Sequence, residues 1–97
     1  MAEISWTAEA ELWLKDIYDY IARDNPEAAA RVVSDMYKRV QILKDFPETG
    51  YWYREEPEGD IRILLYGHYK IAYLIRRENN IDILGVFHGA LDIERHL

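Results

Sequence analysis

Basic and imidazole side chains in the C-terminal third of this chain could carry out acid–base and phosphate chemistry. Arg62 and Lys70 lie in two successive apolar stretches, and His88 and His96 follow nearer the end. Cleavage of RNA requires a base for the 2′-hydroxyl, an acid for the leaving oxygen and a cation that stabilises the phosphorane. His88 or His96 could exchange the protons, and Lys70 or Arg62 could hold the phosphate.

The same residues also fit an ordinary solvated surface. On this interpretation Arg62 pairs with Asp82 or Asp60, and an exposed ion pair of this kind contributes only about 0–1 kcal/mol to stability. Charged surface residues are far commoner than functional sites, so spacing alone favours this second interpretation.

Other kinds of site have little support in the sequence. It lacks cysteine, an HExxH pair, both glycine-rich phosphate-binding patterns and the GxSxG pattern of hydrolases. Thiolate metal sites, zinc peptidase sites and nucleotide-binding loops are therefore not indicated. The histidines are His68, His88 and His96, and they show no metal-ligand spacing. We expect neither a metal nor a cofactor.

Length and charge limit the class of protein further. The chain has 97 residues, which we expect to form one domain over residues 1–97. The formal net charge is −6, and the bases do not gather into a broad basic footprint. Binding through many phosphate contacts is therefore disfavoured. No apolar run approaches the ~20 residues that span a bilayer, and no signal-peptide pattern is present, so we expect a cytoplasmic protein.

The N-terminal half predicts a strand followed by two helices. Residues 2–6 alternate between apolar and polar, which predicts a short strand. Apolar residues then recur at helical spacing over residues 8–23 and 26–45. Thr7 can cap the first helix, and Asn25-Pro26 can end it and begin the second. The short link makes the two helices an antiparallel hairpin that must cover a sheet.

The C-terminal half predicts three more strands, at residues 61–65, 69–75 and 81–88. Short turns join them, so they are antiparallel neighbours. Residues 49–59 are expected to form a loop and residues 89–97 a short tail or helical turn. The expected fold is therefore α+β, with an N-terminal strand and an antiparallel helical hairpin packed on a small antiparallel β-sheet, in the order β-α-α-β-β-β.

Alternation along the strands predicts which residues share a face. Strict alternation places Ile81, Ile83 and Phe87 opposite to Leu84, Val86 and His88. Arg62 and Lys70 are expected to be neighbours across the first hairpin. One sheet face is expected to pack on the helices and the other to be solvated or to cover a partner. The aromatic residues 51–53 fit either a fold back onto the helices or an exposed patch that needs a partner.

Several short motifs follow one another over nearly the whole chain. They are Ala10-Glu11-Leu12 with residues 17–22, Asp24-Asn25-Pro26-Glu27-Ala28-Ala29, Phe46-Pro47-Glu48-Thr49-Gly50, Arg62-Ile63-Leu64 with residues 67–73, and residues 83–89 followed by Asp92 and His96-Leu97. In this order they resemble the RelE/ParE superfamily of toxins from type II toxin–antitoxin systems.

The resemblance implies a cognate antitoxin that wraps the groove and sheet of the toxin. RelE-like members cut messenger RNA on the ribosome, whereas ParE-like members poison DNA gyrase and are not nucleases. Lys70 matches the central basic position of the nucleases. Ile61 and Ile63 stand where further lysines would be expected, Ala90 where a late arginine would be, and His96 where a tail tyrosine would be.

These departures favour the ParE-like, non-enzymatic activity. The RelE-like nuclease is the alternative, with Arg62, Lys70, His88 and His96 as its catalytic residues. A degenerate toxin that only binds its antitoxin and represses their shared operon is a third possibility.

The resemblance also suggests which residues bind partners. Those expected to bind the target are Lys70, His88, Asp92, Arg95 and His96. Those expected to bind the antitoxin are Trp52, Tyr53, Arg62, Leu64, Ala72 and Leu74. Because the tail lies beyond the last expected strand, we expect it to be needed for toxicity but not for folding.

Overall fold

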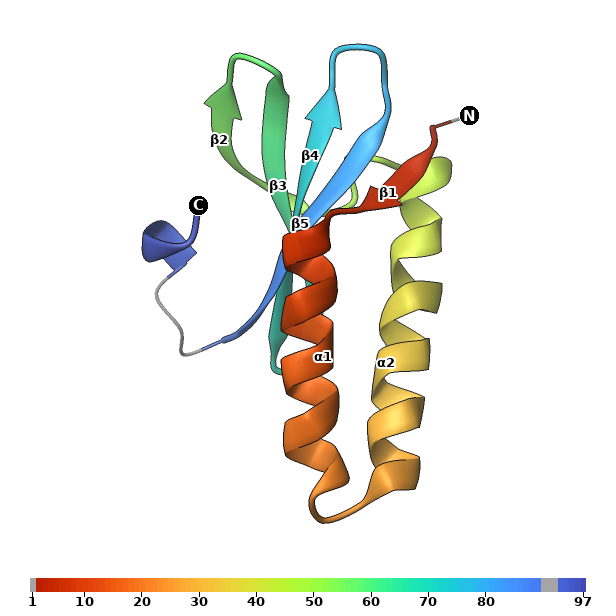
Figure 1. Ribbon diagram of the computed structural model, residues 1–97. Coiled ribbons are helices and arrows are strands. Elements are labelled where there is room, and N and C mark those ends of the chain that lie inside the picture. The colour runs from red at the N-terminus through yellow and green to blue at the C-terminus, as the bar shows by residue number, and fades with distance from the viewer. Residues whose placement is uncertain (1, 90–92) are drawn as a thin grey trace.

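A computed structural model describes residues 2–89 and 93–97 of the protein (Figure 1). Two antiparallel helices lie side by side on one face of a single sheet. This is the α+β architecture expected from the sequence. The elements are β1 (Ile4–Trp6), α1 (Ala8–Ala22), α2 (Pro26–Val40), η1 (Gln41–Lys44), β2 (Tyr51–Glu56), β3 (Gly59–Tyr66), β4 (Tyr69–Arg76), β5 (Ile81–His88) and η2 (Ile93–Arg95). Within the described residues, no helix has the length and apolar character needed to cross a membrane.

Capping interactions set the start of each helix. The Thr7 hydroxyl accepts a hydrogen bond from an amide in the first turn of α1 at 3.1 Å and donates to the Ile83 carbonyl at 2.8 Å, which ties α1 to β5. Asn25 accepts from an amide in the first turn of α2 at 3.0 Å, and Pro26 takes the first helical position. Both helix starts agree with the sequence.

Helix α2 ends earlier than expected. It stops at Val40 rather than Asp45, and the chain continues as the tighter turn η1. Leu43 in this turn is fully buried. Val40 and Leu43 continue the helical spacing of apolar residues, so the sequence predicted a longer helix. Helix ends often tighten into 3₁₀ geometry, as here.

The sheet has five strands in the order β1-β5-β4-β3-β2, one more than the sequence indicated. Strand β1 pairs parallel to β5, and the other pairs are antiparallel. The expected loop over residues 49–59 is wrong, because residues 51–56 form the edge strand β2. Its register to β3 shifts between Trp52 and Arg54. This bulge interrupts the alternation that would have marked a strand.

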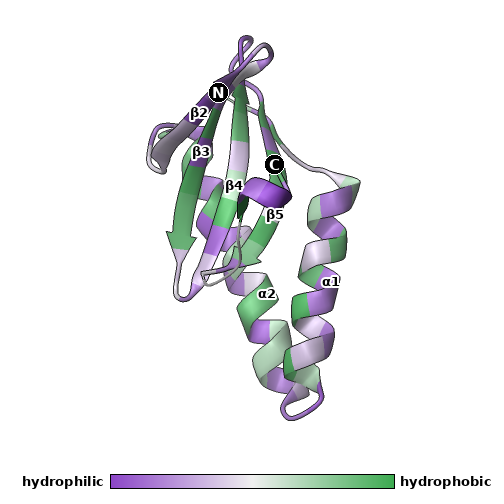
Figure 2. Ribbon diagram, turned by 90° about the vertical axis from the view of Figure 1, so that its left-hand side faces the viewer, coloured by the Kyte–Doolittle hydropathy of each residue, from purple (hydrophilic) through white to green (hydrophobic). Residues whose placement is uncertain are grey.

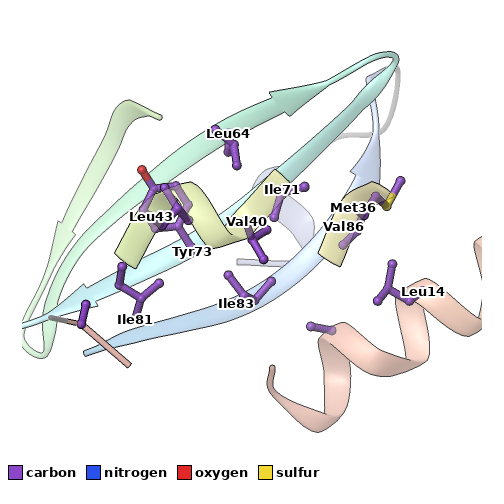
Figure 3. Packing of buried hydrophobic residues seen from close by; sticks show 12 residues of the cluster. Leu14, Met36, Val40, Leu43, Leu64, Ile71, Tyr73, Ile81, Ile83 and Val86 are labelled. Atoms are coloured by element: carbon purple, nitrogen blue, oxygen red, sulfur yellow. The ribbon is translucent and has the colours of Figure 1, made fainter. Parts of the chain in front are cut away.

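The main core lies between the helices and the sheet, on the side we call the helix face (Figure 3). Leu14 and Met36 from the helices meet Val86 and Ile71 from the strands. Further along the same layer lie Val40, Leu43, Leu64, Tyr73, Ile81 and Ile83. The helical hairpin buries its apolar stripe as the sequence predicted.

A second bulge changes which residues of β5 face the helices. Ala72 pairs with Gly85 while the next residue, Tyr73, pairs with Ile83, so Leu84 is an extra residue. Strict alternation is therefore wrong beyond this point. Phe87 lies on the face opposite to the helices. A Cβ atom at Gly85 would lie 2.5 Å from the Phe87 ring, so the ring fits because residue 85 has no side chain.

The other side of the sheet, which we call the tail face, is covered by the end of the chain. In Figure 2 the short turn η2 lies in front of β4 and β5. Ile93 is 7% exposed and packs with Ile63, Ala72 and Phe87, each at most 1% exposed. The sheet face away from the helices was expected to be solvated or to cover a partner. Much of it instead packs against residues 93–97 of the chain itself.

Candidate functional site

The structure separates the two cations that were expected to be neighbours. Arg62 pairs with Tyr73, whose side chain belongs to the helix-face core, and Lys70 pairs with Leu65 and Phe87. Directly opposed residues in a sheet project from the same face. Arg62 is therefore on the helix face and Lys70 on the tail face, and the expected Arg62–Lys70 pair is wrong.

Arg62 anchors the segment that follows η1. Its guanidinium donates hydrogen bonds to the carbonyl of Gly50 at 2.5 Å and to that of Glu48 at 3.3 Å. It makes no ion pair with Asp60 or Asp82 among the described residues. Asp82 is paired with Arg76 instead, with 2.6 Å between Nη2 and Oδ2. These contacts indicate that Arg62 stabilises the fold by binding the backbone of residues 48–50.

The Tyr73 hydroxyl binds the same segment through two hydrogen bonds. Its buried hydroxyl accepts a hydrogen bond from the Gly50 amide at 2.9 Å and donates one to the Pro47 carbonyl at 2.6 Å. Burial raises the pKa of Tyr73. A Cβ atom at Gly50 would lie 2.6 Å from the Ile63 carbonyl oxygen and 2.8 Å from the Tyr73 ring. The close approach explains why glycine occupies this position.

A shallow hollow at the β3–β4 turn is lined by Lys70 and by two histidines. Its volume is about 280 Å³, and Lys70, His68 and His88 are among the residues that line it. The His88 ring also packs edge-on against the Tyr69 ring at 5.9 Å. His68 was not among the expected site residues, although its position in the tight turn before Lys70 could have suggested it.

His96 lies elsewhere, among aromatic rings. It stacks on Phe87 at 5.7 Å between ring centroids and meets Trp13 edge-on at 5.1 Å. Trp13 comes from α1 and also contacts Phe87 at 4.8 Å. Of the four residues expected to be catalytic in a nuclease, only Lys70 and His88 line one hollow. Of the other residues expected to bind a target, Arg95 is exposed on η2 and Asp92 lies outside the described residues.

The residues expected to bind an antitoxin are distributed over several surroundings. Trp52 on the edge strand is 55% exposed. Tyr53 donates a hydrogen bond to the Glu94 carboxylate of the tail. Leu64 is buried in the helix-face core, and Ala72 and Leu74 are buried on the tail face. The sequence did not indicate the burial of Ala72, because it depends on Ile93 of the tail.

Further contacts that the sequence did not suggest hold the tail in place. Arg54 donates a hydrogen bond to the Leu97 carbonyl at 2.5 Å and pairs with Glu56 at 2.9 Å. Ile93 and Leu97 pack on the tail face. Their apolar spacing in an otherwise polar tail was the available signal. Within the described residues, no three metal-binding side chains come together.

A more apolar groove of about 310 Å³ runs between α1 and the ends of β4 and β5. Trp13, Ile17, Tyr20, Tyr69 and Val86 line it, with Asp16 and His88 at its polar positions. Tyr20 is 73% exposed. An aromatic, partly open groove of this kind is typical of a surface that binds another protein.

Comparison with known proteins assigns this arrangement to a family. The model of the ParE toxin of the type II toxin–antitoxin system parDE matches residues 4–93. The chain belongs to the ParE toxin family. That match includes both helices, all five strands and the first residue of η2.

Individual relatives agree with this family. The chain is 36% identical over 86 residues to the Sinorhizobium fredii protein named "Putative toxin Y4kP", covering 89% of this chain and 86% of that protein. A structure of the chromosomal ParDE system from P. aeruginosa matches with a TM-score of 0.73 and 26% identity, covering 91% and 96% of the two chains. The RelBE2 toxin–antitoxin complex from Mycobacterium tuberculosis shares the fold, with a TM-score of 0.59, 23% identity and coverage of 90% and 96%.

Proposed function

We propose that this ParE-family toxin inhibits DNA gyrase and is neutralised by a cognate antitoxin. The observation that carries the proposal is the match of the ParE model to residues 4–93, which covers nearly the whole chain. The structural relatives from ParDE and RelBE2 systems are described as toxin–antitoxin assemblies, which supports an antitoxin partner here.

The distribution of cations supports a gyrase inhibitor over a nuclease. A nuclease must neutralise a phosphorane, and clustered cations in a preorganised site are the usual means. Among the residues that the structure describes, Lys70 is the only Lys or Arg that lines its hollow. Arg62 lies on the opposite face and is bound to backbone carbonyls. His96 packs against Trp13 and Phe87 instead of joining Lys70.

One observation favours ribosome-dependent cleavage of messenger RNA as a second candidate. Lys70, His68 and His88 all line the hollow at the β3–β4 turn, and two histidines with one cation are a minimal set for acid–base cleavage, although the His88 ring lies beside Tyr69 on the helix face. The gyrase inhibitor and the nuclease therefore predict opposite effects of substituting Lys70.

A paired assay of purified toxin separates the candidates. We expect the wild-type chain to inhibit supercoiling by gyrase and to leave ribosome-bound messenger RNA intact. Lys70→Ala should keep most of the gyrase inhibition, because Lys70 is one of several residues expected to bind the target, whereas a nuclease needs this cation. Lys44→Ala, which removes an exposed lysine of η1, is the matched control. RNA cleavage that Lys70→Ala abolishes and Lys44→Ala spares would establish the nuclease instead.

Pulse-labelling of cells minutes after induction gives the same answer in vivo. DNA synthesis should fall before protein synthesis if gyrase is the target. An earlier fall in protein synthesis would favour the nuclease. If neither falls while an antitoxin still co-purifies, the chain is a degenerate toxin that only binds its partner.

A further inference from the structure

A groove on the tail face, at the opposite end of the strands from Lys70, has an apolar floor. Its volume is about 290 Å³, and Ile61, Leu74 and Leu84 contribute its apolar side chains. Ile61 and Leu74 are directly paired across β3 and β4, and Leu84 is the extra residue of the β5 bulge. His96 and Leu97 of the tail form one wall.

Carboxylates from two separate elements line the same groove. Glu9 comes from the first turn of α1, and Glu56 and Glu58 come from the end of β2 and the following turn. Glu56 is paired with Arg54. The side chains of Glu9 and Glu58 are exposed and make no hydrogen bond or ion pair with any residue that the structure describes. The groove thus combines an apolar floor with two carboxylates that have no cation.

Long basic side chains match this combination. Lysine and arginine carry an alkyl stem that packs on apolar surface and a charged head that stays near water and carboxylates. A purely apolar side chain would leave the carboxylates without a partner, and a small cation would leave the floor uncovered. The net charge of −6 also favours association with a basic segment.

We propose that this groove receives a lysine or arginine side chain from the antitoxin. The inference rests on the proposed function, because it deepens the antitoxin contact. An anionic segment would be repelled by Glu9 and Glu58, so charge complementarity favours a basic one. The groove also continues the apolar tail face, since Leu74 lies two residues along β4 from the buried Ala72 and projects from the same face.

The test compares antitoxin binding to two double variants. Glu9→Gln/Glu58→Gln removes both unpaired carboxylates of the groove. Glu27→Gln/Glu55→Gln is the matched control, because Glu27 is in the first turn of α2 and Glu55 is an exposed residue of β2, and neither lines the groove. The probe is the purified antitoxin encoded by the adjacent gene. Dissociation constants are measured at low and moderate salt after circular dichroism confirms folding.

We expect the groove variant to bind the antitoxin about tenfold more weakly at low salt, equivalent to ~1.4 kcal/mol, with a smaller salt dependence than wild type. The control should bind as wild type does. Equal affinity and salt dependence for both variants would overturn the groove inference while leaving the proposed function intact. Absence of antitoxin binding to the wild-type chain would overturn both. Weakened binding to gyrase in place of antitoxin would assign the groove to the target and overturn the inference.

Discussion

At the scale of single residues, Tyr73 and Arg62 explain how the segment after η1 is fixed. Both side chains bind its backbone, Tyr73 through Gly50 and Pro47, and Arg62 through Gly50 and Glu48. Alternation in the sequence predicted that one sheet face packs on the helices, and Tyr73 lies on that face. It could not assign Arg62 to backbone anchoring, because the carbonyls that it binds belong to a segment whose path was unknown.

We predict that Tyr73→Phe destabilises the fold by about 1–3 kcal/mol, because the buried Gly50 amide then loses its acceptor. Chemical denaturation with an unchanged m-value measures the loss. Tyr20→Phe is the control, since Tyr20 is 73% exposed and its ring lies on α1. Equal stability of the Tyr73→Phe variant and wild type would show that water replaces the lost hydrogen bond.

At the scale of elements, the sequence predicted the parts that depend on local interactions. Thr7 and Asn25-Pro26 mark the helix starts because a cap and its amides are close in the chain. Strand β2 and the faces of β5 were missed because each contains a bulge, which changes the two-residue period. The site was predicted less well than the fold, because its residues meet only after the sheet has formed.

The tail is the element whose structure changes an expectation about function. It was expected to be dispensable for folding, but Ile93 fills the tail face over Ile63, Ala72 and Phe87. Removing residues after Gly89 would expose these side chains to water. Loss of toxicity in such a truncation would therefore not identify a target-binding segment. Substitution of the exposed Arg95 tests target binding without uncovering the core.

We predict that Ile93→Ala lowers the free energy of unfolding by about 2 kcal/mol, because a buried side chain leaves a gap on the tail face. Ile42→Ala is the matched control, since Ile42 is 37% exposed and should change stability far less. Thermal unfolding of the three proteins compares them directly. Similar melting temperatures for Ile93→Ala and Ile42→Ala would show that the tail does not contribute to the fold.

At the scale of the whole molecule, tyrosine hydroxyls join separate elements in their neutral form, and burial raises the pKa of three of them. Tyr37 donates to Glu11 at 2.8 Å, Tyr66 donates to Asp35 at 3.3 Å, and Tyr73 donates to Pro47. Burial, aided by the Glu11 carboxylate, raises the pKa of Tyr37 to about 12. Burial and the neighbouring Asp35 also raise the pKa of Tyr66. Each contact therefore requires a protonated phenol.

We predict from these raised pKa values that alkaline pH lowers the stability of the protein. A tyrosine whose pKa is higher in the folded state contributes stability that is complete below its unfolded pKa of about 10. That stability is lost as the pH rises from there through about 12, the folded pKa of Tyr37. Melting temperatures measured between these values should therefore fall. Tyr37→Phe should be less stable than wild type at neutral pH, because it loses the bond to Glu11, and should show a shallower alkaline decline. An equally steep decline in that variant would mean that the other ionisations, and not Tyr37, control stability at high pH.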